Sequence, residues 1–290
     1  VEEMTGLVEA MRGVAVAIDV GESVVVDTAG TGGDRSGTFN ISTTAAIIAA
    51  GAGAMVAKHG NRSASSRCGS ADVLEGLGMV IDLPPGQTVR LMRETNFGFF
   101  FAPHYHPAMS HAGLVRRELG VPTVFNFLGP LVNPAGARRQ AIGVSDPKMA
   151  ERMIGVLYRL DAEYAFVYYG EDGLDEITTT GPTSIFRLKD GEITHAQFTP
   201  EDFGVLRSRP DDLLGGDLET NVAIVRSVLA GDTGPQRDVA LVNASPALVA
   251  AGLAPGFVEG VEVAARSVDS GAAARVLEQV VALSREAAKG

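Results

Sequence analysis

The sequence predicts an α/β fold organised around a parallel sheet. Residues 23–62 contain a short β-branched run, a glycine-rich loop, an apolar helical run and a second strand, which is the order of a parallel βαβ unit. Predicted strands and helices go on alternating to residue 170, and the chain after residue 216 is mainly helical. With 290 residues, 46% of them hydrophobic, the chain can form one large domain or two smaller ones.

Residues 1–20 predict a helix, because Met4, Leu7 and Met11 recur at helical spacing. This apolar stripe needs a partner elsewhere in the fold. Since no capping residue precedes the stripe, we expect further chain upstream of Val1.

The remaining elements follow from local composition. Residues 24–26 are a β-branched run typical of a buried strand, and residues 45–50 are an apolar run typical of a helix packed on a sheet. A proline after Asp146 predicts a capped helix start, and Asp190 with Gly191 predicts a turn. Further helices are predicted at 70–77, 86–95 and 107–119, from residue 147, and at roughly 217–229, 236–252, 256–269 and 272–288. Further strands are predicted at 54–57, 97–101, 140–144 and 164–169, with short strands over 178–198.

Composition excludes several classes of protein. The net charge is −11, with 35 acidic and 24 basic residues, whereas nucleic-acid binding requires a basic face. Cys68 is the only cysteine, which excludes an internal disulfide and a cysteine-based zinc site. No apolar run reaches membrane length and no signal peptide is recognisable, so we expect a cytoplasmic protein with neither nucleic acid nor membrane as a partner.

A glycine-rich loop at residues 27–44 predicts an anion-binding site. It contains four glycines, several Thr and Ser hydroxyls and Asp34, between a predicted strand and the start of a helix. Glycines let the backbone approach a ligand closely, and unpaired N–H groups at a helix start favour phosphate. No lysine follows the glycines as in a P-loop, and the third glycine is misplaced for a dinucleotide motif. The alternative, a tight strand–helix turn without a ligand, requires only one or two glycines.

A second polar cluster, residues 58–70, follows the next predicted strand. Lys58 and Arg62 supply positive charge, and Ser63 and Ser70 belong to a second hydroxyl and glycine loop. Because ligands of open parallel sheets lie beyond the carboxyl ends of the strands, we expect both clusters to meet in one cleft. The alternative is a solvated loop with isolated charges.

Four carboxylates lie within six residues at the end of another strand, in the segment 170–177. Asp175 and Glu176 have apolar neighbours on both sides, which predicts that they are held against the core. A hard cation such as Mg²⁺, shared with substrate phosphates, neutralises such a pair. The alternative, a solvated acidic loop, suits Glu171 and Asp172 better.

Two pairs of polar residues have simpler interpretations. His104 and His106 have no carboxylate or third histidine nearby in the sequence, so we interpret the flanking prolines as fixing the backbone. Arg116 and Arg117 end a predicted helix, where cations compensate the helix dipole. That role fits at least one of the two arginines.

A series of motifs follows in a fixed order along the chain. They are GTGGD at 30–34, TFNIST at 38–43, KHGNRS at 58–63, GSADVLEGLG at 69–78, HPAM at 106–109, VRRELG at 115–120, FNFLGPLVNP at 125–134 and GEDGLDEI at 170–177. In this combination the chain resembles the anthranilate phosphoribosyltransferase family. The resemblance extends over residues 1–290 without a large gap.

The resemblance implies a fold and a reaction. The fold is a small helical domain, expected at 1–20 and 84–121, and a large α/β domain at 22–83 and 122–290, with a mostly parallel mixed sheet flanked by helices as in nucleoside phosphorylases. The family carries further helices before the position of Val1 and is usually a homodimer through the helical domain. The implied reaction transfers the phosphoribosyl group of 5-phosphoribosyl 1-diphosphate to the amine of anthranilate in tryptophan biosynthesis, with Mg²⁺ as cofactor.

The resemblance also implies site residues, position by position. Residues matching the site for the sugar diphosphate are Gly30, Gly33, Asp34, Thr38, Asn40, Ile41, Ser42, Thr43, Lys58, His59, Gly60, Asn61, Arg62, Ser63, Ala64, Ser65, Ser66 and Ser70. Those matching anthranilate contacts are Gly30, Asn61 and Arg116, with His59 beside them, and those matching magnesium ligands are Ser42, Asp175 and Glu176. No residue is implied as a general acid or base. Cys68 and Arg35 replace a Ser and a Gly that are common in the family, at positions that match no ligand.

The residues permit a mechanism based on orientation and on stabilisation of the leaving group. Two other functions stay open at this point. A nucleoside phosphorylase of the same fold would bind free phosphate and a nucleobase, and would not need the pair Asp175 and Glu176. A non-catalytic, nucleic-acid-binding relative would be basic around the cleft and would have a disrupted acidic pair.

Overall fold

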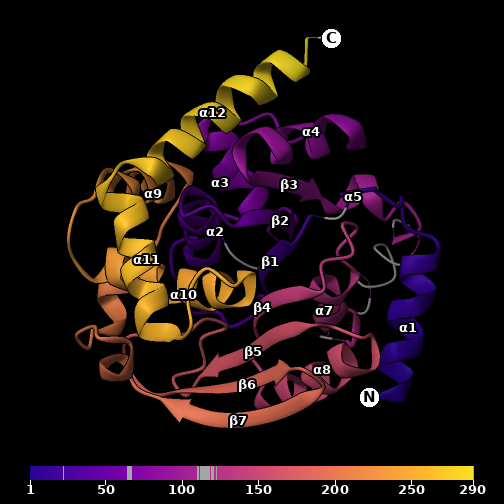
Figure 1. Cartoon of the computed structure of the whole chain (residues 1–290), viewed down its shortest axis with the longest axis horizontal. Helices are drawn as coiled ribbons and strands as arrows, with labels where there is room; N and C mark the ends of the chain where they lie inside the picture. Colours follow the sequence, from indigo (N-terminus) through magenta and orange to yellow (C-terminus); the bar gives the residue numbers. More distant parts are fainter. Residues whose placement is uncertain are drawn as a thin grey trace.

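The structure, a computed structural model, describes residues 1–21, 23–63, 67–109, 111, 118, 121 and 123–289. Within these residues, seven strands form one sheet in the order β3-β2-β1-β4-β5-β6-β7, with helices on both faces (Figure 1). Strands β1 to β5 are parallel to their neighbours, and β6 and β7 are added antiparallel at one edge. The predicted mixed, mostly parallel sheet is therefore confirmed.

The elements have the following bounds. The strands are β1 Val25–Gly30, β2 Met55–Gly60, β3 Phe97–Phe101, β4 Arg139–Gly143, β5 Tyr164–Gly170, β6 Thr183–Lys189 and β7 Glu192–Phe198. The α-helices of the described residues are α1 Glu2–Gly13, α2 Ile41–Gly51, α3 Ser70–Leu77, α4 Pro85–Thr95, α5 Ala102–Tyr105, α7 Phe125–Leu128, α8 Pro147–Arg159, α9 Leu218–Ala230, α10 Pro235–Ala251, α11 Phe257–Asp269 and α12 Ala272–Ala287. Short 3-10 helices are η1 Gly129–Val132, η2 Pro200–Phe203 and η3 Pro210–Leu213.

Alternate side chains of the strands enter different cores. Phe166 and Tyr168 of β5 belong to the large core, which the sheet shares with α2, α10 and α12. Ala165 and Val167 of the same strand belong to a second core, beneath α8 and α1. A third core lies between β2, β3, α4 and the segment 16–20. Helices cover both faces because both faces of a parallel sheet are apolar.

The first helix is shorter than the sequence predicts. α1 ends at Gly13, whereas the apolar periodicity predicts a helix to residue 20. Val16 N–H instead donates to the carbonyl oxygen of Tyr105 at 2.8 Å, and Ile18 and Val20 pack on the third core. Tertiary packing of these side chains therefore overrides local helix propensity.

Most other predicted elements are confirmed. The helix predicted at 70–77 has these bounds and ends at Gly78, whose φ of 104° favours glycine. Asp146 Oδ1 caps α8, as the proline after it predicts. The β6–β7 hairpin turns at Asp190 and Gly191, both of which have positive φ. The helix predicted at 107–119 lies largely outside the described residues.

The division into a small helical and a large α/β domain stays a prediction. Within the segment 84–121, β3 is hydrogen-bonded to β2 in the sheet, and α4 packs beside β3. This part of the segment thus joins the sheet layer. α1 packs on α8 and η1, where Arg12 donates to the carbonyl oxygen of Leu131 at 2.7 Å.

Candidate active site

Four neighbouring parallel strands end in glycine at one edge of the sheet. They are β2, β1, β4 and β5, which end at Gly60, Gly30, Gly143 and Gly170. A Cβ atom at Gly30 would lie 2.6 Å from Asp175 Oδ2, and a Cβ at Gly143 would overlap the Asp175 backbone. These glycines therefore let the acidic segment after β5 lie directly over the strand ends. The glycine at the end of each of these strands is visible in the sequence. The sequence predictions missed it, because they treated each strand separately.

Asp175 and Glu176 lie where the sequence predicts, against the glycine-rich loop. Gly32 N–H donates to Asp175 Oδ2 at 2.6 Å, and Ser42 N–H at the start of α2 donates to Glu176 Oε1 at 3.1 Å. Only 8% of Asp175 and 7% of Glu176 is exposed, which contradicts a solvated acidic loop at these two positions. The prediction that this pair is held against the core is confirmed, and the loops after β1 and β5 meet at one point.

The backbone after Glu176 is fixed by a buried asparagine of α10. Ile177 N–H donates to Asn243 Oδ1 at 2.8 Å, and Asn243 Nδ2 donates back to the carbonyl oxygen of Ile177 at 2.8 Å. Asn243 thereby anchors the acidic pair to the large core. The sequence predictions missed this residue, because nothing near it in the chain indicates a polar role.

The acidic pair carries more negative charge than its surroundings neutralise. Burial, and then the charge of the nearby Asp34 carboxylate, raise the pKa of Asp175 to about 7. Burial, and then the charge of Asp175, raise the pKa of Glu176 well above its usual range. Buried carboxylates of this kind need a cation or a proton. Together with the Ser42 hydroxyl they form a set of oxygen donors that fits Mg²⁺.

The donors are too few to enclose a metal on their own. Across the described ranges, no group of three or more His, Cys, Asp or Glu side chains is arranged to hold a metal ion. Mg²⁺ typically keeps several waters and shares one or two carboxylates with substrate phosphates. The site therefore fits an ion that is held jointly with a phosphate-bearing ligand.

Lys58 supplies the positive charge of the site. Its side chain is 2% exposed, and Nζ donates to the carbonyl oxygen of Thr28 at 2.5 Å and to Ser42 Oγ at 3.5 Å. Burial lowers its pKa, and the charge of Asp27 is the largest influence in the opposite direction. The two predicted clusters thus meet, and Asp27 is a site residue to which the sequence predictions assign no role.

The loop after β1 presents backbone rather than side chains. Gly32 and Gly33 have φ values of 69° and 83°, which glycine adopts without strain. Ile41 and Thr43 are 1% exposed and face the core, so their contribution to a ligand site is limited to N–H groups. Asn40 precedes α2 without capping it, its Nδ2 donates to the carbonyl oxygen of Cys68, and its buried Oδ1 has no partner within the described part of the chain. A helix start favours an anion, and here the Glu176 carboxylate takes that place by accepting from Ser42 N–H.

Two further predicted residues of this loop, Thr38 and Asp34, are partly buried. Thr38 forms an isolated bridge with Leu214, and its hydroxyl lies 3.2 Å from Ser36 Oγ. Asp34 Oδ1 accepts from Ser36 N–H at 3.3 Å. These contacts shape the loop between Gly33 and α2.

The segment after β2 is tied to α3. Asp72 Oδ2 accepts N–H groups of Ser63 and Gly69 at 3.2 and 2.8 Å, and Ser70 Oγ donates to the carbonyl oxygen of Asn61 at 3.1 Å. The Arg62 guanidinium is paired with Asp72 and Glu75. The structure therefore engages Arg62 with carboxylates of α3, which the sequence predictions did not foresee. Ala64, Ser65, Ser66 and Arg116 lie outside the described residues.

His59 lies in a buried histidine pair. Its Nδ1 lies 3.1 Å from the carbonyl oxygen of Gly129, and its ring centroid lies 5.0 Å from that of His106. Burial lowers the pKa of His59 to about 3, so the ring is neutral at physiological pH. His104 Nε2 pairs with Asp82 at 2.9 Å, so the two histidines of the 103–107 segment do not face one metal.

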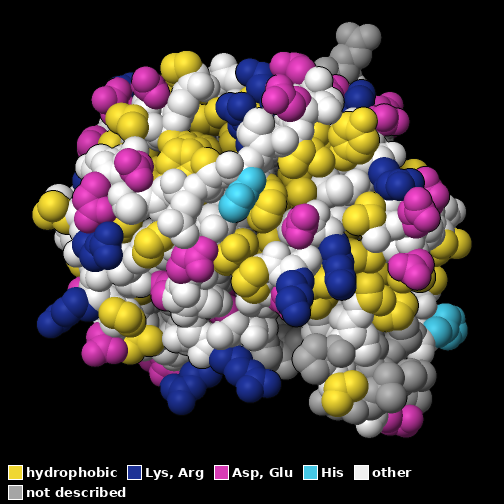
Figure 2. Space-filling view, turned by 90° about the horizontal axis from the view of Figure 1, so that it is seen from below, with side chains coloured by type: hydrophobic (Ala, Val, Ile, Leu, Met, Phe, Trp, Pro, Cys, Tyr) yellow, Lys and Arg dark blue, Asp and Glu magenta, His cyan; other side chains and the backbone are white. Residues whose placement is uncertain are grey.

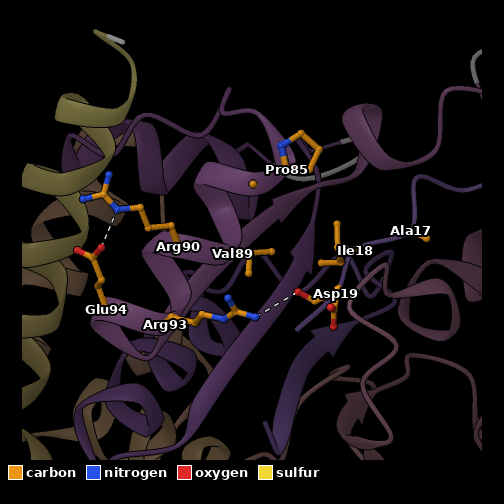
Figure 3. Close-up of a pocket in the computed structure, with 9 residues that line it drawn as sticks. Ala17, Ile18, Asp19, Pro85, Val89, Arg90, Arg93 and Glu94 are labelled. Atoms are coloured by element: carbon orange, nitrogen blue, oxygen red, sulfur yellow. Dashed lines mark hydrogen bonds and ion pairs between the residues drawn. The ribbon is translucent and has the colours of Figure 1, made fainter. Parts of the chain in front are cut away.

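A cavity of about 530 Å³ lies apart from these residues. It is formed by residues 17–19 and the first three turns of α4 (Figure 3). Its charged side chains are already engaged, since Arg90 pairs with Glu94 at 2.7 Å and Arg93 donates to the carbonyl oxygen of Asp19. We therefore place the active site at the strand ends.

The chain is similar to known proteins over nearly its whole length. The model of the glycosyl transferase family, a/b domain, matches residues 22–274. Anthranilate phosphoribosyltransferase of Moorella thermoacetica is 52% identical over 282 residues, which are 97% of this chain and 83% of the relative.

Solved structures give the same result. The anthranilate phosphoribosyltransferase of Thermus thermophilus has a TM-score of 0.92 at 43% identity, with 98% of this chain and 84% of that chain covered. The enzyme of Saccharomyces cerevisiae, in complex with PRPP and Mg, has a TM-score of 0.91 at 29% identity, with 98% and 80% covered. This chain belongs to the anthranilate phosphoribosyltransferase family.

Proposed function

We propose that this chain transfers the phosphoribosyl group of 5-phosphoribosyl 1-diphosphate to the amine of anthranilate. The products are N-(5-phosphoribosyl)anthranilate and pyrophosphate, and the reaction belongs to tryptophan biosynthesis. The observation that carries the proposal is the buried pair Asp175 and Glu176, bonded to the glycine-rich loop beside Lys58. It joins carboxylates, an ammonium group and the start of a helix at one point, as the release of a diphosphate requires.

The chain's own residues can bind the diphosphate and orient it. The positive end of the α2 dipole points at the site, and the Lys58 ammonium lies beside Ser42 Oγ. Ser42, Asp175 and Glu176 are the residues that would hold Mg²⁺. When bound, the ion supplies positive charge that stabilises the departing diphosphate. Because this charge is fixed before the reaction, no reorganisation is needed as the leaving group develops.

We assign anthranilate to Asn61, Gly30 and Arg116, with His59 beside them. A guanidinium pairs with a carboxylate through two parallel hydrogen bonds, so Arg116 suits the carboxylate of anthranilate. The amine nitrogen forms the new bond to ribose C1 as the C1–oxygen bond to the diphosphate breaks. The nitrogen then loses a proton to solvent, so neither a strong base nor a covalent enzyme intermediate is required.

A fluorescence assay tests this function. The chain is mixed with anthranilate, the sugar diphosphate and Mg²⁺, and we expect anthranilate fluorescence to fall only when all three are present. Phosphate-dependent cleavage of a pyrimidine nucleoside is measured in parallel. Cleavage of the nucleoside without consumption of anthranilate would assign the chain to the phosphorylase reaction instead.

The surface does not support the nucleic-acid-binding alternative. On the face shown in Figure 2, basic side chains are interspersed with acidic ones and form no continuous basic band. The acidic pair is also intact. Nucleic-acid binding needs clustered positive charge.

The assembly and the location of the protein complete the proposal. We infer a homodimer through the helical domain and a cytoplasmic location, and light scattering of the purified chain tests the first. Among the described helices, none is long and apolar enough to cross a membrane.

A further inference from the structure

The backbone ladder between β1 and β2 is incomplete near the site. Their paired register covers the residues Val25 and Val26 of β1, whereas β1 stays paired with β4 as far as Gly30. The two strands stay neighbours, but their ladder ends before the edge at which the site lies. This gap in the ladder leaves buried backbone N–H and C=O groups that need other partners.

Two charged side chains replace the lost ladder bonds. Asp27 Oδ1 accepts from His59 N–H at 3.2 Å, so a side chain of β1 satisfies the backbone of β2. In the opposite direction, Lys58 Nζ donates to the carbonyl oxygen of Thr28 at 2.5 Å. Each strand thus contributes one charge to the gap and bonds the backbone of the other.

Asn133 closes the gap from the adjacent turn. Its Nδ2 donates to Asp27 Oδ2 and to the carbonyl oxygen of Ala57, both at 2.7 Å, while its Oδ1 accepts from Ala135 N–H at 2.8 Å. Asn133 is 3% exposed and Asp27 is fully buried. Neither residue can therefore touch a ligand directly, and any effect on the reaction passes through Lys58 or the β2 backbone.

We propose that Asp27 and Asn133 are positioning residues, which fix the β2 backbone on both sides of Lys58 and thereby set its ammonium beside Ser42. Asp27 accepts from the N–H group of His59, the residue after Lys58, and Asn133 bonds both the Asp27 carboxylate and the carbonyl oxygen of Ala57, the residue before Lys58. The inference rests on the proposed function, since the anion that Lys58 meets is the diphosphate. It assigns a role in binding to two residues that lie outside the ligand-facing loops.

Binding of inorganic pyrophosphate in the presence of Mg²⁺, measured by calorimetry, tests this without turnover. The Asp27→Asn variant keeps the size of the side chain and removes its charge. We expect its affinity for pyrophosphate to fall about tenfold to a hundredfold, the usual range for residues that support ligand-binding groups. In the fluorescence assay, kcat should fall in parallel while the KM for anthranilate changes by less than about twofold, because Asp27 does not touch that subsite.

Two further variants distinguish the positioning of Lys58 from a general loss of stability. Asn133→Ser keeps the Asp27 charge and removes one neutral partner, so we expect a smaller loss of affinity, about fivefold. It also keeps the inference testable if Asp27→Asn does not fold. Thr95→Val is the matched control: Thr95 is 3% exposed and donates to the carbonyl oxygen of Leu91 at 2.7 Å, at the junction of α4 and β3. It should lower the Tm without changing the affinity for pyrophosphate.

Each outcome of these measurements supports or overturns the positioning role. Pyrophosphate affinity of Asp27→Asn and Asn133→Ser within about twofold of the unaltered chain, or an equal loss in Thr95→Val, overturns the positioning role. If the unaltered chain binds pyrophosphate but does not consume anthranilate, the proposed function fails while the positioning role stands on the binding data. If the unaltered chain does not bind pyrophosphate, both fail.

Discussion

Two sets of buried carboxylates lie at the same edge of the sheet, and their charges are compensated to different degrees. The charge of Lys58 and two accepted hydrogen bonds lower the pKa of Asp27, so burial raises it only to about 6. Asp175 and Glu176 accept backbone N–H groups and face further negative charge from Asp34, and burial raises the pKa of Asp175 to about 7.

This difference in charge compensation indicates that Asp27 stabilises the fold, whereas Asp175 and Glu176 are available to a ligand. The partners of Asp27 all belong to the protein, so removing its charge should cost stability. The pair of Asp175 and Glu176 retains an unmet demand for positive charge, because a buried carboxylate without a cation is unfavourable. The comparison predicts different responses of the two sets to neutralising substitutions and to metal.

The largest expected effect comes from neutralising the pair. Asp175→Asn with Glu176→Gln should lower kcat about a thousandfold or more, because the electrostatic stabilisation of the leaving group is lost. At pH 8 without metal the Tm should not fall, since two under-compensated charges disappear. By contrast, Asp27→Asn should lower the free energy of unfolding by about 2 kcal/mol, because the buried N–H groups of His59 and Asn133 lose a charged acceptor.

Steady-state turnover and calorimetric unfolding of the metal-free variants check both halves of this prediction. Near-normal turnover of the double variant in excess Mg²⁺ would contradict the metal-binding role of the pair. A large fall of its Tm would show that the pair, like Asp27, stabilises the folded state.

The second effect uses the glycine at the end of β1. In Gly30→Ala the new Cβ would lie 2.6 Å from Asp175 Oδ2, so the carboxylate must move while Asp27, earlier on the same strand, keeps its partners. We expect kcat to fall about a hundredfold, since a displacement of about 1 Å at a reacting site has such an effect. Gly6→Ala in α1 is the matched control, because its Cβ would meet no atom within 4 Å. An equal loss of kcat in both variants would remove the steric explanation.

Features that depend only on neighbouring residues, or on the direction of parallel strands, can be predicted from the sequence. Gly78 ends α3, Asp146 caps α8, and each needs only its neighbours in the chain. The contact of Gly32 with Asp175, 143 residues apart, is also predictable, because both residues follow parallel strands of one sheet.

The remaining features could not be predicted, because they depend on long-range contacts that no regular spacing in the sequence reveals. Asn133 lies 106 residues from Asp27, and its turn-rich segment gives no hint of a polar partner. The composition of the 58–70 cluster indicates a phosphate contact for Arg62, yet the fold places two carboxylates of α3 within reach of its guanidinium. The end of α1 at Gly13 likewise depends on the sheet that residues 16–20 meet.

The third effect is on stability and needs no substitution. The folded-state pKa of Asp175 is about 7, above the value of about 4 in an unfolded chain, so its contribution to stability is present at low pH and is lost as the pH rises through 7. Mg²⁺ binds the ionised pair, so it should raise the Tm more at pH 8 than at pH 5. At a concentration of 100 times its Kd the gain is about 2.7 kcal/mol, or about 4 °C for a chain of this length.

Differential scanning calorimetry with and without Mg²⁺ measures this shift. The double variant Asp175→Asn with Glu176→Gln is the control and should show no gain at either pH. An equal gain at pH 5 and pH 8, or a gain that persists in the control, would place the metal elsewhere.

The smallest effect isolates the contribution of Asp34. Its carboxylate is the charge that raises the pKa of Asp175 most, and it is not among the groups that influence Asp27. Asp34→Asn should therefore reduce the loss of metal-free stability between pH 5 and pH 8, by less than about 1 kcal/mol because Asp34 is partly exposed. Asp34→Glu keeps the charge and should leave the loss unchanged. If both variants respond alike, the conformation of the loop, and not its charge, sets the pKa of Asp175, and the contrast with Asp27 then rests on burial alone.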